Sequence, residues 1–414
     1  MIGFILATIK IIFLLGFLIF IHELGHFTVA KLCKVKVNEF AIGFGPVILK
    51  KQGKETKYEL RLIPLGGFVS MEGEDEHSDN ERSFSKASIP RRMAIVLAGA
   101  TVNIIFGIVV YFILATTMET FVTNEVDLVQ EGFASQSVGI QSGDIIIEVN
   151  GHKINNGKDL NKNLSKSKGE ELKLKIKRNE EIKEIPLVPT EVKTKVTGMY
   201  LDEDLKIISI KKGSSAEKAG ILQNDKLFKI NNEEIKDNKD KIIEIIKQND
   251  VLDVEVKRGS QNIKLTMKPD YVSNYYVGVI LKKAPDTFRN KIIGACMNTG
   301  DFILSIVDNI KQLFTGKVGV NQMMGPVGIS KVVAKTNGLQ EFIYMMALIS
   351  LSLGVTNLLP IPALDGGKML ILIIEAIRRK PMKEELEIKI QMIGFAILIA
   401  ISIYVTYNDI LRIL

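Results

Sequence analysis

The stretch IKIIFLLGFLIFIHELGH, residues 9–26, decides how the rest of the chain is interpreted. Its first part is apolar enough to belong to a membrane-spanning helix, which takes about 20 such residues. Its last five residues, HELGH, place two histidines and a glutamate in the same helix. Ionisable groups within a membrane helix are energetically costly and mark function by default. The stretch therefore predicts a membrane protein with a polar site inside a span.

Four segments of the 414-residue chain are apolar enough to cross a bilayer, so we expect a polytopic α-helical membrane protein. The expected spans are residues 2–32, 93–117, 342–359 and 390–407. The first is expected to be a retained helix, because no small-residue cleavage site of a signal peptide follows it. The spans leave a long polar region between the second and the third, so the protein combines membrane and water-soluble parts.

The formal net charge of +7 is explained by basic residues beside the spans. These residues are Lys31, Lys34, Lys36, Arg91, Arg92, Arg378, Arg379, Lys380 and Lys383. By the positive-inside rule their loops face the cytoplasm, so both chain ends and the region 118–290 face outward. The charge has no nucleic-acid-binding signature beside it. We therefore expect the lipid bilayer, and no nucleic acid, as a partner.

An internal repeat lies between the second and third spans. GFASQSVGIQSGDIIIEVNGHKI (132–154) aligns with GSSAEKAGILQNDKLFKINNEEI (213–235), aspartates and asparagines included. Each copy predicts a short helix, a turn, an alternating strand, a second helix and a further strand. Each resembles a circularly permuted bacterial PDZ domain of the α+β class. The second copy has Asn224 and Asn232 where the first has glycines, so we expect strained or altered turns there.

These features divide the chain into four parts. The expected parts are an N-terminal membrane part (1–117), two tandem PDZ domains (118–192 and 193–285) and a C-terminal membrane part (286–414). In the first part, alternation in KYELRLI and the glycines of GFGP and PLGGFV predict a membrane-associated β-hairpin region. In the last part, apolar residues at helical spacing after Asp301 predict an amphipathic helix at the membrane surface or against the bundle.

HELGH is an H-E-x-x-H motif. On a helix, His22 and His26 share one face and can both bind one Zn²⁺, while Glu23 can act as the general base. Five-residue patterns also arise by chance, and two buried histidines at a helix end are the alternative interpretation. The position of the motif in a span favours a metal site.

A catalytic zinc usually has three protein ligands, so one more is needed. The other two histidines lie in an acidic loop and in the first repeat, which makes them poor candidates. Asp365, in NLLPIPALDGG (357–367), is the acidic residue at the end of the third span. Pro360 and Pro362 would break the helix there, and broken backbone at membrane depth is tolerated where it lines a cavity. An ordinary turn at a helix end is the alternative.

Taken in order, HELGH, GFGP, PLGGFV, the paired repeats, MMGPVGI and NLLPIPALDGG cover nearly the whole chain. In this combination the chain resembles the intramembrane zinc metalloproteases of the site-2 protease family. The resemblance implies one Zn²⁺ bound by His22, His26 and Asp365, with Glu23 as the general base. It also implies that Asn357 contacts the substrate backbone or the developing oxyanion.

The resemblance has further implications for the substrate. It implies that the hairpin at Gly43 and Gly45 pairs with an unwound substrate segment, and that Pro360 and Pro362 lie at the substrate site. The family often has a proline in the second span where this chain has GATVN (99–103), so a kink there is in doubt.

The implied activity is cleavage of transmembrane segments of single-span proteins after prior trimming, in regulated intramembrane proteolysis. Anti-sigma factors or remnant signal peptides are the implied substrates. The implied location is the bacterial cytoplasmic (inner) membrane, with the active site toward the cytoplasm. The PDZ domains, on the outer side, would act as a size filter or bind peptide C-termini.

Two other functions stay open. A membrane adaptor would carry the PDZ domains beside an inert HELGH, would hold no metal and would be insensitive to Glu23→Gln. A transporter would also use broken helices to line a site. A transporter, however, predicts corresponding broken helices in two repeated halves, and the sequence contains no such repeat.

Overall fold

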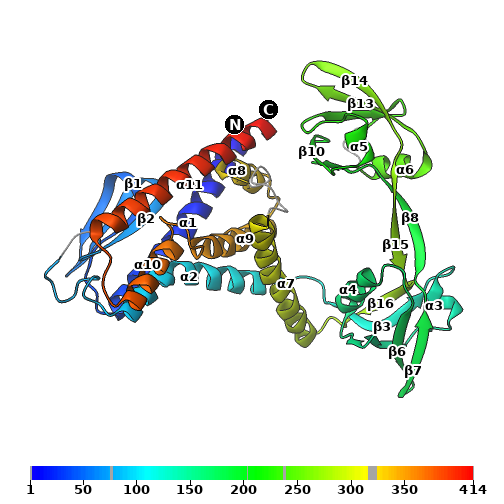
Figure 1. The fold of residues 1–414 in the computed structure, drawn as a ribbon, viewed down its shortest axis with the longest axis horizontal. Coiled ribbons are helices and arrows are strands. Elements are labelled where there is room, and N and C mark those ends of the chain that lie inside the picture. The colour runs from blue at the N-terminus through cyan, green and yellow to red at the C-terminus, as the bar shows by residue number, and fades with distance from the viewer. Residues whose placement is uncertain (1, 75–77, 203, 236–238, 316–323, 414) are drawn as a thin grey trace. The chain divides into compact units, whose positions relative to one another are not determined.

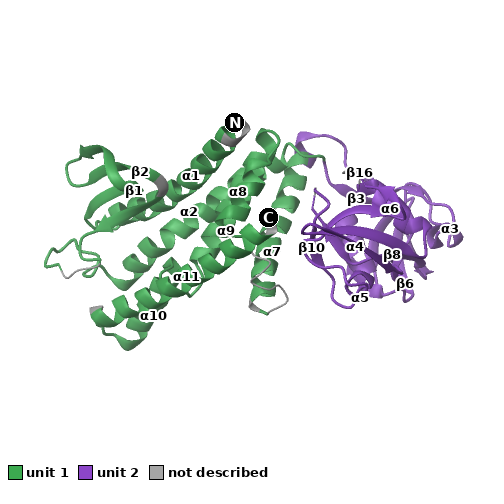
Figure 2. Cartoon of the chain, turned by 90° about the horizontal axis from the view of Figure 1, so that it is seen from above, with its two compact units in different colours: residues 1–119, 291–414 green, residues 120–290 purple. Residues whose placement is uncertain are grey.

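The structure, a computed structural model, forms two compact units (Figure 2). Unit 1 comprises Met1–Glu119 and Lys291–Leu414, and unit 2 comprises Thr120–Asn290. The residues that the structure describes are 2–74, 78–202, 204–235, 239–315 and 324–413.

Unit 1 is a helical bundle with one sheet (Figure 1). Its helices are α1 (Ile2–Leu32), α2 (Ile89–Ala115), α7 (Phe288–Phe314, which begins just before the unit), α8 (Pro326–Ala334), α9 (Leu339–Asn357), α10 (Asp365–Arg378) and α11 (Glu384–Ile413). Among them α1, α2, α9 and α11 are long and apolar enough to cross a membrane, which confirms the four predicted spans. Their ends differ from the predicted ones by a few residues only.

Glycines let α1 and α9 approach α2 closely. A Cβ atom on Gly25 of α1 would lie 2.7 Å from the Ala98 carbonyl oxygen, and one on Gly354 of α9 would lie 2.7 Å from the Ala100 carbonyl oxygen. Small residues at helix contacts are typical of membrane bundles, where close packing drives association. The α2 helix is continuous through residues 99–103, as expected for a segment that has no proline.

The predicted amphipathic helix is α7, and its apolar face packs against the bundle. Phe302 and Ile306 are buried in a cluster with Tyr111 of α2 and Ala347 of α9. The rings of Phe302 and Tyr111 are stacked, with centroids 4.0 Å apart. Of the two predicted positions, the structure supports packing against the bundle.

Two charged side chains from the spans hold the ends of α8. Asp409 of α11 accepts hydrogen bonds from the amides of Gly325 and Gly328 at its N-terminus. Lys10 of α1 donates to the carbonyl and hydroxyl oxygens of Thr336, just past its C-terminus. Both charges complement the helix dipole, which explains why a lysine and an aspartate are tolerated in apolar helices.

The predicted hairpin region is a sheet of two long strands, β1 (Val37–Gln52) and β2 (Lys57–Met71), which contacts α1 (Figure 1). Both strands fold back, so that Glu39–Ile42 pairs with Lys57–Leu60 on one side and with Gly67–Ser70 on the other. In the described part of the chain, Gly67–Met71 is paired along one side only. We call Gly67–Met71 the edge strand.

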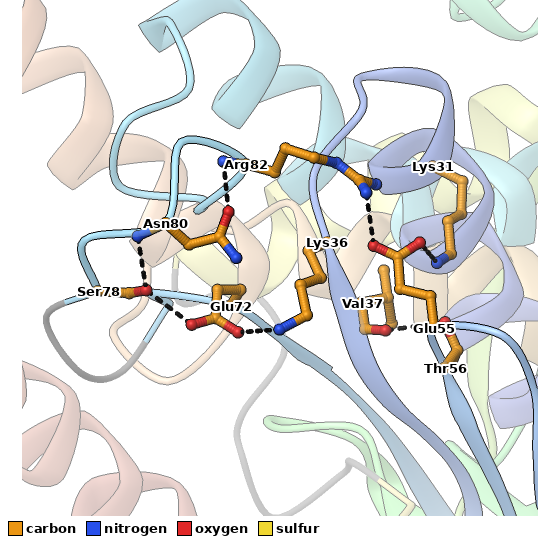
Figure 3. A network of polar contacts seen from close by, with 9 residues as sticks. All are labelled: Lys31, Lys36, Val37, Glu55, Thr56, Glu72, Ser78, Asn80 and Arg82. Carbon is orange, nitrogen blue, oxygen red and sulfur yellow. Dashed lines mark hydrogen bonds and ion pairs between the residues drawn. The ribbon is translucent and has the colours of Figure 1, made fainter.

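A polar network fixes the open end of this sheet (Figure 3). The Glu72 carboxylate accepts hydrogen bonds from the Ser78 hydroxyl at 2.6 Å and from the Lys36 ammonium at 2.9 Å. These hydrogen bonds lower the pKa of Glu72 to about 2. The Glu55 carboxylate is paired with Arg82 at 2.9 Å in the same network. The connection between the sheet and the helices is therefore held by charge-assisted hydrogen bonds.

Unit 2 contains two α+β lobes, each with its own buried core. Lobe 1 consists of β3 (Val122–Val129), α3 (Ala134–Ser137), β4 (Ile145–Val149), β5 (His152–Lys153), α4 (Gly157–Ser167), β6 (Leu172–Arg178), β7 (Glu181–Leu187) and β16 (Val279–Lys283). Lobe 2 consists of β9 (Met199–Leu201), β10 (Ile207–Ile210), α5 (Ser215–Lys218), β11 (Lys226–Ile230), β12 (Glu233–Glu234), α6 (Lys239–Gln248), β13 (Leu252–Arg258) and β14 (Gln261–Met267). The main sheets have the orders β16-β3-β4-β6-β7 and β12-β11-β13-β14.

The lobes are nested, which differs from the predicted tandem boundaries of 118–192 and 193–285. The strand β16 follows lobe 2 in sequence but pairs with β3, and Val277 is buried in the core of lobe 1. The connecting strands β8 (Thr190–Val196) and β15 (Asp270–Tyr276) pair with each other and return the chain to lobe 1. The two repeated segments, 132–154 and 213–235, each lie within one lobe. The repeat therefore carries no information about which lobe β16 completes.

The turns of lobe 2 keep the shape of those in lobe 1. Asn224 and Asn232 have φ angles of 75° and 65°, and the corresponding Gly143 and Gly151 have 90° and 80°. Asparagine tolerates the left-handed region better than other non-glycine residues. Of the two expectations for these positions, altered turns are wrong, and the left-handed backbone at two non-glycine residues agrees with strained turns.

Candidate metal centre

The helix α1 presents His22 and His26 on one face, one turn apart. Their Nε2 atoms are 3.1 Å from each other, and the two side chains are 12% and 13% exposed. The neighbouring helix α2 passes the pair at Gly99, where a Cβ atom would lie 2.3 Å from Nε2 of His26. Only glycine leaves room for both imidazole rings at this crossing.

Asp365 reaches the histidines from another part of the bundle. It is the first residue of α10, and its Oδ2 atom lies 3.4 Å from Nε2 of His22 and 3.6 Å from Nε2 of His26. The helix α9 ends at Asn357, so the predicted break before Asp365 is present. A Cβ atom on Gly366 would lie 2.3 Å from the Leu359 carbonyl oxygen, so the broken segment folds tightly onto the start of α10.

These three side chains fit a zinc ion. Two imidazole nitrogens and one carboxylate oxygen, all within 4.8 Å of one another, form a donor set of the kind found in catalytic zinc sites. The Oδ2 atom of Asp365 is buried and accepts no hydrogen bond from the described residues. A buried carboxylate oxygen without a donor is unfavourable unless a cation is nearby.

Polar neighbours orient both imidazole rings. Nδ1 of His26 lies 2.8 Å from the Ile95 carbonyl oxygen, to which it can only donate, so Nε2 keeps its lone pair for a metal. Nδ1 of His22 is 3.4 Å from Nδ2 of Asn103 and 3.5 Å from Nδ2 of Asn357. The Asn103 side chain is buried, and its Oδ1 has no hydrogen-bond partner among the described residues. Turning this amide over would let Oδ1 accept the Nδ1 proton of His22.

A cavity of about 220 Å³ surrounds the three side chains. It is lined by His22, Glu23, His26, Phe68, Val69, Met71, Glu74, Ile95, Val96, Asp365 and Lys368. Glu23 therefore opens onto the same space as the histidines. One wall is the edge strand, whose Gly67 is so close to α1 that a Cβ atom would lie 3.1 Å from Cγ of Glu23.

The structure brings together some of the predicted site residues and separates others. Asn357 lies beside His22. Gly43 and Gly45 lie in β1, and neither they nor Pro360 and Pro362 line the cavity. Pro362 instead contacts α11, where a Cβ atom on Gly394 would lie 2.4 Å from it.

Sequence reasoning missed several residues at the site. The GATVN stretch (99–103) indicates only a missing proline, whereas in the structure its Asn103 contacts His22. Phe68, Val69 and Met71 of the edge strand line the cavity, and PLGGFV had been assigned only to the hairpin region. The glycine pair beside Phe68 was the available signal, since glycines in a strand often mark a close approach of another element.

The geometry of the site indicates the class of protein. A histidine pair, a carboxylate and a neighbouring glutamate in a cavity between apolar helices are the parts of a metal-dependent hydrolase in a membrane bundle. The profile of peptidase family M50 matches residues 10–401. The chain therefore belongs to peptidase family M50.

Individual relatives cover almost all of the chain. A Clostridium acetobutylicum protein, whose name presents it as a candidate zinc metalloprotease, is 32% identical over 95% of this chain and 94% of its own. The regulator of sigma-W protease RasP of Bacillus subtilis is 29% identical, with 99% of each chain covered. The regulator of sigma E protease of Haemophilus influenzae is 28% identical, over 95% of this chain and 96% of its own. The protein is a zinc metalloprotease, and four of its described helices are long and apolar enough to cross a membrane.

Proposed function

We propose that the chain is an intramembrane zinc endopeptidase that cleaves transmembrane segments of single-span membrane proteins. The observation that carries this proposal is the convergence of His22, His26 and Asp365 beside Glu23, between helices that can span a membrane. Two relatives are named as proteases that regulate sigma factors. These names favour anti-sigma factors as substrates, with remnant signal peptides as a second class.

His22, His26 and Asp365 would hold the metal. When bound, Zn²⁺ supplies a Lewis acid that acidifies water and polarises the scissile carbonyl. Glu23 would accept the proton of the attacking water and return it to the leaving amine. The amide of Asn357, whose Nδ2 lies 3.5 Å from Nδ1 of His22, would donate to the oxygen that becomes negative during attack. Ile95 and Asn103 would keep the two imidazoles in the tautomer that exposes Nε2.

The edge strand is the better candidate for holding the substrate backbone. A transmembrane helix must unwind before one of its peptide bonds can be cut, and an unwound segment can add to a free sheet edge. Gly67–Met71 has such an edge and supplies Phe68, Val69 and Met71 to the cavity. Gly43 and Gly45, which the family resemblance implicates, would act at a distance by shaping the sheet.

The proposal is tested by cleavage of a tagged single-span substrate with wild type and Glu23→Gln, first in cells and then with purified protein. We expect Glu23→Gln to bind zinc like wild type and to leave the substrate uncut. Glu385→Gln, an exposed acid on α11, is the matched control and should cleave normally. Equal cleavage by Glu23→Gln and wild type would contradict the protease function and favour the adaptor.

We further propose that the metal centre faces the cytoplasm and that unit 2 lies outside. The basic residues at the ends of α1, α2 and α10 support this orientation by the positive-inside rule. An epitope placed after Arg379 should become accessible to antibody in spheroplasts only after the membrane is permeabilised. Labelling of intact spheroplasts would reverse the orientation.

Unit 2 would act as a size filter that admits substrates already trimmed on the outer side. Val196 and Asp270 are ladder partners in β8 and β15, so residues 197–269 can be replaced by an Asn-Gly turn without losing β16. We expect this variant to cleave an untrimmed substrate that wild type rejects, while both cleave the trimmed one. Continued rejection of the untrimmed substrate would count against the filter.

Binding of peptide C-termini is the second role for unit 2. A cavity of about 260 Å³ lies beside β16 and is lined by Leu160 and Leu164 of α4 and by Val277–Val279. If a new C-terminus docks there, purified wild type should cleave a trimmed substrate faster than the same substrate with an amidated end. Equal rates would leave the size filter as the role of unit 2.

A further inference from the structure

Two cavities of unit 1 meet beside the candidate metal centre. The second cavity, of about 380 Å³, is lined by the start of α10 and by residues 387–392 of α11. We call the cavity of about 220 Å³ around His22, His26 and Asp365 the catalytic cavity. The two cavities have three lining residues in common, Glu74, Asp365 and Lys368. The partition between the two spaces is therefore built from very few side chains.

Glu74 and Lys368 form an ion pair in this partition. Nζ of Lys368 is 2.6 Å from Oε1 of Glu74, and the two side chains are 22% and 17% exposed. The same ammonium lies 5.2 Å from the ring centroid of Phe84. A short, charge-assisted contact that is mostly shielded from water is stronger than an ion pair on an open surface.

The pair joins the two walls of the catalytic cavity. Glu74 lies three residues after the last residue of the edge strand, Met71, and its amide donates to the Met71 carbonyl oxygen at 3.4 Å. Lys368 lies three residues after Asp365 on α10, which places both side chains on one helix face. One wall would hold the substrate backbone and the other supplies a metal ligand, so their spacing decides where the scissile bond lies relative to the metal.

We propose that Glu74 and Lys368 are positioning residues that form a clasp across the catalytic cavity. The clasp fixes the edge strand against α10 and separates the metal centre from the cavity beside α11. This inference rests on the proposed protease function. It assigns no chemical step to either residue, because both act by holding the edge strand at a fixed position relative to α10.

The first test is a double-mutant cycle with purified full-length protein and a single-span substrate. Glu74→Gln and Lys368→Met should each lower kcat/KM by about 10-fold or more, because a small misplacement of reacting groups is costly. The double variant should be no worse than the poorer single variant, since both changes open one contact. Lys368→Arg, which keeps the charge, should recover most of the activity.

The second test measures how accessible the catalytic cavity is and does not depend on cleavage. Val69→Cys, in a background with Cys33 and Cys296 replaced, places a thiol in the catalytic cavity. In metal-free protein, Glu74→Gln or Lys368→Met should raise the rate of maleimide labelling at this thiol several-fold. Lys175→Met, which breaks the Lys175–Glu148 ion pair in unit 2, is the control and should change neither labelling nor kcat/KM by more than 2-fold.

The clasp is refuted if either single variant cleaves within 2-fold of wild type. It is also refuted if the double loss equals the product of the single losses, or if labelling does not change. Zinc content and the unfolding temperature are measured for every variant, and a loss that follows zinc depletion or unfolding also refutes the clasp. If Glu23→Gln is inactive while the clasp variants are normal, only the clasp fails. If Glu23→Gln cleaves normally, the proposed function fails first.

Discussion

Two aspartates of unit 2 and Asp365 of unit 1 have opposite surroundings for their buried carboxylate oxygens. In unit 2, Asp144 is 1% exposed, and both of its oxygens accept hydrogen bonds from Arg178, at 2.6 and 2.7 Å. Asp225 has the same bidentate contact with Arg258, at 2.8 Å for each oxygen. In unit 1, Oδ2 of Asp365 accepts no hydrogen bond within the described residues and points toward two histidines.

This contrast separates charges that serve the fold from charges that serve chemistry. Burial raises the pKa of Asp144, but the Arg178 hydrogen bonds outweigh burial and hold that pKa below its usual range. The charge is therefore neutralised where it lies, and the lobe gains a fixed turn. Asp365 has no such partner, so its site is complete only with a cation. The same residue type is a structural support in one unit and a candidate metal ligand in the other.

The largest expected effect is on Asp365 itself. Asp365→Asn should lose bound zinc and reduce cleavage below detection, because it removes one of three ligands. The metal-free variant should unfold at the same temperature as metal-free wild type or higher, since Asp365→Asn removes the charge from an oxygen that is buried without a hydrogen-bond donor among the described residues. Metal analysis and thermal unfolding check both statements. Asp144→Asn should do the reverse, keeping zinc and destabilising unit 2; zinc retention by Asp365→Asn would break the comparison.

The second effect concerns the arginines of unit 2. Arg178→Met should destabilise the isolated unit by about 3 kcal/mol, because it leaves Asp144 buried without its partner. Arg258→Met should cost less, because Arg258 is 34% exposed and Arg178 is 22% exposed. Urea unfolding measures both values, and cleavage of a trimmed substrate by the full chain should stay normal. Equal stability of Arg178→Met and wild type would show that the pair does not support the fold.

The third effect concerns Asn103, a buried polar residue of unit 1 that contacts His22. Asn103→Leu should lower zinc affinity by about 10- to 100-fold, the usual range for a residue that orients a ligand. Metal-free stability should fall by about 1–3 kcal/mol, because the leucine leaves the Nδ1 proton of His22 without its acceptor. Competition with a chelator measures the affinity. An unchanged affinity would mean that His22 is oriented without Asn103.

A smaller effect is expected at the asparagine turn of lobe 2. Asn232→Val should destabilise unit 2 by about 1–2 kcal/mol, because its φ of 65° is unfavourable for a β-branched residue. Asn232→Gly should leave the stability unchanged or raise it slightly, because glycine adopts positive φ without strain, as Gly151 does at the corresponding position of lobe 1. Urea unfolding measures the free energy of unfolding of both variants. Equal values would mean that the turn changes its conformation to accommodate valine.

The smallest effect is the acid response of the network at the sheet of unit 1. The pKa of Glu72 falls from 4.5 to about 2 on folding. Its hydrogen bonds therefore stabilise the folded state fully above pH 4.5, and this contribution is lost as the pH falls toward 2. Glu72→Gln should remove this part of the pH dependence of thermal unfolding. An unchanged acid slope in the variant would exclude Glu72 as its source.

Much of the fold and of the site could be predicted from the sequence, because local patterns carry it. Span length, the i and i+4 histidines and the prolines before Asp365 each act within a few turns of the chain. The nesting of the lobes could not be predicted this way. The strand β16 has the same alternation whichever lobe it completes, and only its pairing with β3 decides.

By itself, the sequence determined the spans, the shared helix face of His22 and His26 and the helix break before Asp365, because hydrophobic length, helix period and the effect of proline are local properties. Tertiary structure decided that Gly67–Met71, and not Gly43–Gly45, lines the catalytic cavity. It also decided that Asn103 and Asn357 contact His22. These contacts join residues far apart in the chain, and their geometry depends on the packing of α1, α2, α9 and the sheet together.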